Sequence, residues 1–286
     1  MNILSIFTIL LYNPLLNILI AFYHLLLTLH LPYPLGFAII LLTIVIRLAL
    51  WPFVATQLKA SKKMQALTPH LSKLKEKHKG DSARIQQETM KLYKEHGVNP
   101  LAGCLPMLIQ FPVLITLYNV LGLIVSSNGK HVIDVVNKAV YFPGLKLTHT
   151  IDQHFFGLPL GGSPSKLLAT VGVLILLVPV ITAGLQFIQS KMMFGTPAVP
   201  PTPNKKDNAL QKIEKKVEKK EEDFAQAFQS QSLFLIPLLI GFSSFNFPIG
   251  LSLYWNTFTI FGIIQQYQIA GLGGLNDWIK KIPYGR

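Results

Sequence analysis

Long apolar runs, separated by polar and basic stretches, dominate this chain of 286 residues. A helix needs about 20 residues to cross about 30 Å of hydrocarbon, because each residue adds about 1.5 Å. Five runs approach this length and predict five membrane-spanning helices, at residues 34–57, 101–126, 167–190, 231–247 and 249–269. The turn-forming sequence FNFPIG (245–250) separates the last two runs and predicts a tight helical hairpin.

The first 31 residues are also apolar, but they carry a polar stripe. On a helical wheel, one side holds four polar residues: Asn13, Asn17, His24 and Thr28. No basic residue flanks this segment. The pattern therefore predicts an N-terminal amphipathic helix that lies in the outer membrane interface, with a sixth span as the alternative.

Polar segments connect the predicted spans. Residues 58–99 read as a helical hairpin whose arms meet at GDS (80–82), where Asp81 or Ser82 is suited to cap the second arm. Gly97 is suited to end that arm. Residues 191–230 begin with a Pro-rich linker and continue as a short amphipathic helix.

Composition indicates the class of protein, and the charges of the loops indicate how the predicted spans are oriented in the membrane. Apolar residues make up 50% of the chain, charged residues only 14%, and the mean hydropathy is +0.43, which is typical of a multi-pass membrane protein. Lys and Arg number ten in residues 58–99 and eight in 191–230, against three in 127–165. Basic loops stay in the cytoplasm. The N-terminus is therefore expected outside the plasma (inner) membrane, 127–165 as an extracytoplasmic loop, and 270–286 as a basic cytoplasmic tail.

Arg47 stands in the middle of the first predicted span, within LTIVIRLALWPF (42–53). It lies roughly 18–20 Å along the helix from either end of the span, too far for its head group to reach water comfortably. A charge at this depth costs about 2.5–3.5 kcal/mol. All 13 Asp and Glu residues lie outside the spans. The sequence therefore predicts a hydrated cavity with an uncompensated positive charge, suited to a carboxylate on a hydrophobic polypeptide.

Other polar residues of the spans are candidates to line this cavity. Each also has a structural interpretation, because Ser and Thr bond to their own helix and Gln joins neighbouring helices. The candidates are Thr43, Gln110, Gln186, Gln189, Ser252, Asn256 and Thr259.

Several function classes lack support in the sequence. Cys104 is the only cysteine, the histidines have no zinc-ligand spacing, and no phosphate-binding GxxxxGK[ST] run occurs. The spans hold no paired acids and no Ser–His pair. We therefore expect a protein that is not an enzyme and uses no metal, cofactor, nucleotide or DNA. A small-anion transporter that binds its substrate at Arg47 is the alternative, although no internal repeat supports it. A lipid-scrambling side activity also remains open.

Five stretches carry a resemblance to the YidC membrane insertases: IRLALWPF, KKMQALTPHLSKLKEKHKGD, MKLYKEHGVNPLAGCLPMLIQFPVLITLY, SKMM and LYWNTFTIFGIIQQYQI. The likeness extends from about residue 12 to residue 270. It implies five transmembrane helices around a hydrophilic groove that is open to the cytoplasm and to lipid. It also implies that Arg47, Gln189 and Trp255 line this groove.

The resemblance further implies partners. Nascent membrane proteins would be the clients, the hairpin 58–99 would help to receive them, and the ribosome, the translocon and membrane lipids would be further partners. Departures from the family pattern include the expected lack of the large extracytoplasmic domain of Gram-negative members, and a short basic tail.

Overall fold

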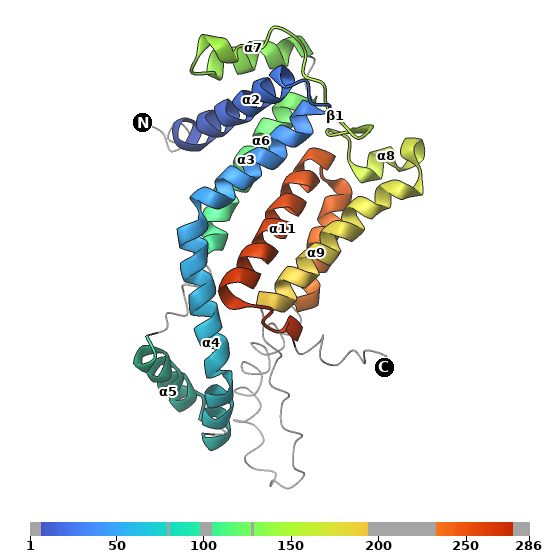
Figure 1. Ribbon diagram of the computed structural model, residues 1–286. Coiled ribbons are helices and arrows are strands. Elements are labelled where there is room, and N and C mark those ends of the chain that lie inside the picture. The colour runs from blue at the N-terminus through green and yellow to red at the C-terminus, as the bar shows by residue number, and fades with distance from the viewer. Residues whose placement is uncertain (1–6, 79–80, 98–104, 127–128, 194–232, 277–286) are drawn as a thin grey trace. The chain divides into compact units, whose positions relative to one another are not determined.

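The computed structural model of the chain describes residues 7–78, 81–97, 105–126, 129–193 and 233–276. These residues are mostly helical, with one antiparallel hairpin formed by β1 (His154–Phe155) and β2 (Leu158–Pro159) (Figure 1). The all-α class is therefore confirmed. Most of the predicted linker and helix at 191–230 and of the tail at 270–286 lies outside the described residues.

The chain divides into two compact units, which are considered separately. The first unit comprises residues 1–52, 106–186 and 238–262, and the second comprises residues 53–105, 187–237 and 263–286. The first unit contains Arg47 and most of the predicted cavity residues.

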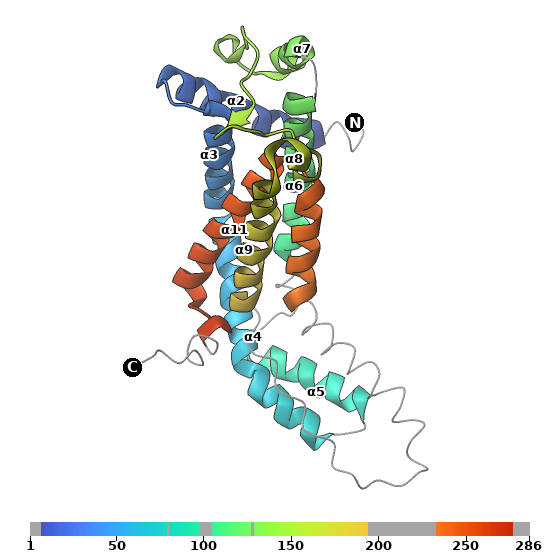
Figure 2. The ribbon, with the colours of Figure 1, turned by 90° about the vertical axis from the view of Figure 1, so that its right-hand side faces the viewer.

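The N-terminal segment forms a π-helical turn, Thr8–Tyr12, and the helix α2 (Asn13–Thr28), which packs on α3 (Pro34–Ala49). Leu16, Leu19 and Ile20 of α2 are completely buried in the core. Figure 2 shows α2 lying across the end of α3.

The polar stripe of α2 contacts the segment that follows α7 (Gly129–Ala139). The Asn17 side chain donates to Ala139 O at 3.0 Å and accepts from Tyr141 N at 2.7 Å. His24 Nε2 lies 3.3 Å from Leu145 O. The stripe therefore satisfies backbone groups of a segment more than 100 residues away.

Replacing Asn17 by Ala is expected to lower the free energy of unfolding by about 1–3 kcal/mol, because it removes the partners of two backbone groups at a buried site. Hydrogen exchange at the Tyr141 amide should become faster. The control is Thr28→Ala, since Thr28 is exposed and donates only to His24 O of its own helix. Equal exchange at Tyr141 in both variants would contradict the assigned role of Asn17.

The predicted first span, 34–57, is interrupted. Helix α3 ends at Ala49, and α4 (Trp51–Lys77) begins after Leu50. Pro52 explains the break, because its ring clashes with the carbonyl four residues earlier and it has no N–H to donate. Helix α4 then continues beyond residue 57, so the structure has no helix break where the sequence interpretation separated the span from the hairpin.

The cytoplasmic hairpin predicted at 58–99 corresponds to α4 and α5 (Ser82–Glu95). The Asp81 side chain accepts from Arg84 N at 3.0 Å, which confirms it as the N-cap of α5. Gly97, with φ of +61°, follows the end of this helix and donates its N–H to Lys94 O. This left-handed conformation explains a glycine here.

The remaining helices follow the predicted order. They are α6 (Leu105–Ser126), α8 (Pro164–Val171), the 3-10 turn Val173–Leu176, α9 (Leu177–Met193), a helix at Leu233–Asn246 and α11 (Ile249–Ala270). A break at Gly172, with φ of +82°, interrupts the run predicted as the span 167–190.

The loop between α7 and α8 fastens helix ends whose backbone groups would otherwise lack partners. Gln153 Nε2 donates to Ile124 O near the end of α6 at 2.6 Å. At the start of α11, Gly250 N donates to Leu160 O at 2.7 Å. The loop therefore links the end of α6 to the start of α11, although these two helices are far apart in the sequence.

An aromatic cluster packs this loop against the start of α3. The Phe155 ring lies 5.4 Å from the Phe37 ring, and the Phe156 ring lies 5.1 Å from the Tyr33 ring, measured between centroids. Gly36 makes room for this packing, since a Cβ at that position would overlap the ring of Phe155.

Among the described residues, Thr8–Thr28 and Val173–Met193 are long and apolar enough to cross a membrane on their own. Pro34–Ala49 and Trp51–Met64 form a third candidate span if they are counted as one, and Phe111–Ile124 and Leu233–Asn246 are shorter apolar helices. These helices identify a membrane protein.

Candidate functional site

Arg47 is the only charged side chain of α3, and it is 4% exposed. Its Nη2 donates to Phe258 O of α11 at 2.6 Å. Its Cζ also lies 3.3 Å from the centroid of the Phe258 ring. Phe258 therefore offers the guanidinium both a carbonyl acceptor and an aromatic ring. The face of an aromatic ring stabilises a cation electrostatically.

The guanidinium retains unused hydrogen-bonding capacity. Arginine has five N–H donors, and the Nε of Arg47 is buried without a partner. No carboxylate pairs with Arg47 among the residues that the structure describes. Within those residues, an ion pair joins His154 and Asp152 in the loop before α8. The charge of Arg47 is thus stabilised by a carbonyl and a ring and is not neutralised.

Thr43 lies one turn before Arg47 and is completely buried. Its Oγ1 donates to Ile39 O at 2.7 Å, within its own helix. In this conformation its hydroxyl thus has the structural role that is common for Thr in spans.

The predicted polar face of α11 separates into three environments. Ser252 Oγ lies 3.1 Å from Ser244 Oγ, and Ser244 in turn donates to Thr182 Oγ1 at 3.3 Å. Thr259 Oγ1 donates to Trp255 O of its own helix. Asn256 Oδ1 is buried and has no partner. Asn256 therefore keeps a free acceptor, whereas Ser252 belongs to a chain of hydroxyls that connects three helices.

Trp255 and Gln186 are brought together: Trp255 Nε1 donates to Gln186 Oε1 at 3.2 Å, which joins α11 to α9. Gln189 lies three residues further along α9, is half-buried, and belongs to the second unit. Gln110 lies in α6, but its side chain is outside the described residues. The grouping of these two with Arg47 therefore stays a prediction.

The sequence interpretation missed three residues: Phe258, Ser244 and Thr182. Phe258 is an apolar residue in an apolar helix and gave no local signal. Ser244 and Thr182 are polar residues within predicted spans, so the criterion that selected Ser252 could also have found them.

The chemistry that this arrangement offers is anion binding. No group of three or more His, Cys, Asp or Glu side chains within the described ranges could hold a metal ion. What Arg47 offers is a buried cation with spare donors, whose present partners are neutral. A carboxylate brought to this position would form a stronger, charge-assisted hydrogen bond than the carbonyl does.

The fold and this arginine define a helical membrane protein with a buried cation that has no carboxylate partner among the described residues. The family model described as 60Kd inner membrane protein matches residues 26–272, and the chain belongs to this family. The predicted resemblance is thereby confirmed.

Three relatives illustrate the match. Membrane protein insertase YidC 2 of Bacillus anthracis is 34% identical over 243 residues, which cover 82% of this chain and 72% of the relative. Membrane protein insertase MisCA of Bacillus subtilis is 32% identical over 241 residues, covering 82% and 70%. Inner membrane protein ALBINO3, chloroplastic, of Arabidopsis thaliana is 31% identical over 269 residues, covering 86% and 48%. The chain thus spans about half the length of this plant relative.

Proposed function

We propose that this chain is a membrane protein insertase that receives nascent membrane proteins at Arg47 and releases them into lipid. The observation that supports this most directly is a guanidinium that is buried, has an unpaired Nε and has no carboxylate partner among the described residues. The names of the bacterial relatives support the same activity.

The interactions that Arg47 makes with Phe258 are weak enough for a client carboxylate to replace them. A cation on a desolvated aromatic ring gains about 2 kcal/mol, and a hydrogen bond that involves a charged group contributes about 1.5–3 kcal/mol. A client carboxylate that replaces Phe258 O would offer an interaction of comparable or greater strength. In the described conformation Phe258 covers the cation, so client binding would require Arg47 and Phe258 to separate.

The proposed mechanism uses no chemical energy source. The client's acidic or polar segment would bind at Arg47, and its apolar segment would then move sideways into lipid, where burial of apolar surface is favourable. Binding inside the protein lowers the cost of carrying charged and polar backbone groups across hydrocarbon.

In the proposed topology, the protein lies in the plasma membrane and has five spans around a hydrophilic groove. Its N-terminus lies outside the cell, and its C-terminus lies in the cytoplasm. In this topology the hairpin of α4 and α5 lies in the cytoplasm and helps to receive clients. The ribosome and the translocon are proposed as further partners.

Site-specific crosslinking during translation of a small membrane protein tests the proposal. Photo-crosslinkers at Trp255 and Gln186, which contact each other, are expected to label the nascent chain. The matched controls are Ile181 and Ile264 on the same two helices, which are 50% and 49% exposed. Labelling of lipid alone from all four positions would overturn the proposed client path.

A further inference from the structure

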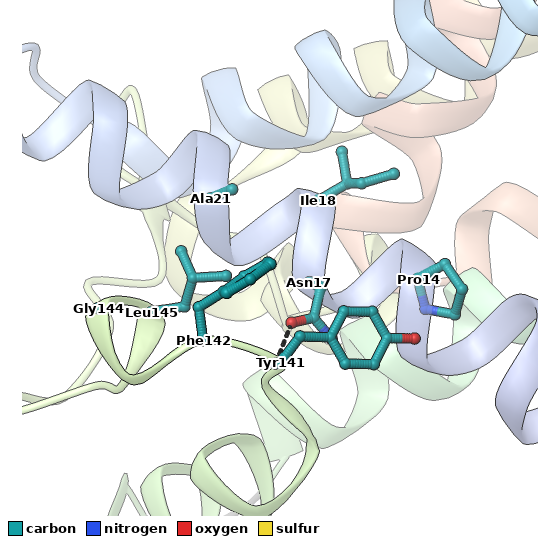
Figure 3. Close-up of a pocket in the computed structure, with 8 residues that line it drawn as sticks. All are labelled: Pro14, Asn17, Ile18, Ala21, Tyr141, Phe142, Gly144 and Leu145. Atoms are coloured by element: carbon teal, nitrogen blue, oxygen red, sulfur yellow. Dashed lines mark hydrogen bonds between the residues drawn. The ribbon is translucent and has the colours of Figure 1, made fainter.

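An apolar pocket of about 690 Å³ lies between α2 and the segment that follows α7 (Figure 3). Pro14, Ile18 and Ala21 form the wall on α2, and Tyr141, Phe142 and Leu145 form the opposite wall. The site is open on one side, so it forms a groove on the surface and not an enclosed cavity. We refer to this site as the α2 pocket.

Asn17 holds the two walls together without making the pocket polar. Its amide nitrogen donates to Asn13 O at 2.8 Å and to Ala139 O at 3.0 Å, and its oxygen accepts from Tyr141 N at 2.7 Å. Both donor hydrogens are thus used, and the residue is 5% exposed. The dashed line in Figure 3 marks the bond that fixes Tyr141.

The edge of the pocket has the composition of a membrane interface. Tyr141 is 54% exposed and Phe142 is 67% exposed. Lys138 and Lys146, both exposed, stand directly before and after the segment 139–145 that forms this wall. Aromatic rings favour the boundary between head groups and acyl chains. A lysine side chain attracts an anionic head group through its opposite charge.

We propose that the α2 pocket binds an acyl chain of an anionic phospholipid, whose head group is held by Lys138 and Lys146. The pocket chemistry favours a lipid over a peptide. A peptide would bring backbone N–H and C=O groups into a site where the amide of Asn17 is already occupied, and unpaired polar groups are costly to bury. An acyl chain has no polar group to satisfy. This site is separate from Arg47 and does not depend on insertase activity.

Native mass spectrometry of the full chain in detergent, with added phosphatidylglycerol or phosphatidylcholine, tests the proposal. The wild-type chain is expected to retain one phosphatidylglycerol more strongly than phosphatidylcholine. Ala21→Trp fills the pocket and should abolish this retention. Leu25→Trp, on the same helix at a position that is 51% exposed and not part of the pocket, should leave it unchanged.

The double variant Lys138→Gln and Lys146→Gln changes only exposed side chains, so it also tests the proposal if Ala21→Trp fails to fold. It should weaken phosphatidylglycerol binding at least about fivefold and leave phosphatidylcholine binding unchanged. Retention by Ala21→Trp equal to that of Leu25→Trp would overturn the acyl-chain site. Unchanged lipid preference in the lysine variant would overturn the head-group assignment. Crosslinks from position 142 to a nascent chain, with none to lipid, would assign the pocket to a peptide instead.

Discussion

Replacing Arg47 by Ala is expected to reduce the insertion of a client with an acidic translocated tail about 10- to 100-fold. The reason is the loss of a charge-assisted hydrogen bond of about 1.5–3 kcal/mol, where about 1.4 kcal/mol corresponds to a factor of ten. Arg47→Lys keeps the charge and is expected to retain most of the activity. The measurement is insertion into liposomes that contain the purified variant, scored by protection of the client's tail from protease.

Two controls separate this effect from a loss of folding. Arg47→Met keeps an unbranched side chain and removes a buried charge, so the cost of keeping that charge away from water is lost. The Arg47→Met variant should therefore have an unfolding temperature at or above that of the wild type, and it should still not insert the acidic client. A client whose acidic residues are replaced by Asn and Gln should be inserted equally by wild type and by Arg47→Ala. Equal insertion of the acidic client by wild type and Arg47→Ala would exclude the electrostatic mechanism for that client.

The second large effect is expected at Gly36. Because a Cβ here would overlap the Phe155 ring, Gly36→Ala should force the ring out of the aromatic cluster. Overpacking of this kind costs about 1–3 kcal/mol. Gly184→Ala is the matched control, since it is another helical glycine and a Cβ there meets nothing within 4 Å. Thermal unfolding in detergent should show a lower midpoint for Gly36→Ala and an unchanged or slightly higher one for Gly184→Ala.

A double-mutant cycle identifies Phe155 as the cause. Once Phe155 is replaced by Ala, the additional change Gly36→Ala should have almost no further effect, because the clashing ring is gone. Additive destabilisation by the two changes would show that Gly36 matters for a different reason, such as the approach of another segment.

Local signals in the sequence predicted much of the architecture. Apolar run length indicated the helical membrane class, and the GDS turn indicated the cap at Asp81, because both depend on residues close together in the chain. The break at Leu50 was missed although Pro52 signals it. The apolar pattern continues across Pro52 and so predicts one continuous span, whereas the ring of Pro52 interrupts the helix at Leu50.

Long-range contacts were beyond the reach of the sequence. The polar stripe predicts a helix in the membrane interface, but it does not reveal that Asn17 bonds to residues 122 and 124 positions away in the sequence. Arg47 was identified because a charge is conspicuous in an apolar run. Its partner Phe258 was not, because an aromatic residue in an apolar helix looks like ordinary packing.

The hydroxyl chain of Thr182, Ser244 and Ser252 has a mechanical consequence. Together with the bond between Trp255 and Gln186, it couples α9, the helix Leu233–Asn246 and α11 by several side-chain contacts. Between α3 and α11, the described polar contacts include the one that Arg47 makes with Phe258. Because of the hydroxyl chain and the bond between Trp255 and Gln186, we expect α9, the helix Leu233–Asn246 and α11 to move together as one rigid group.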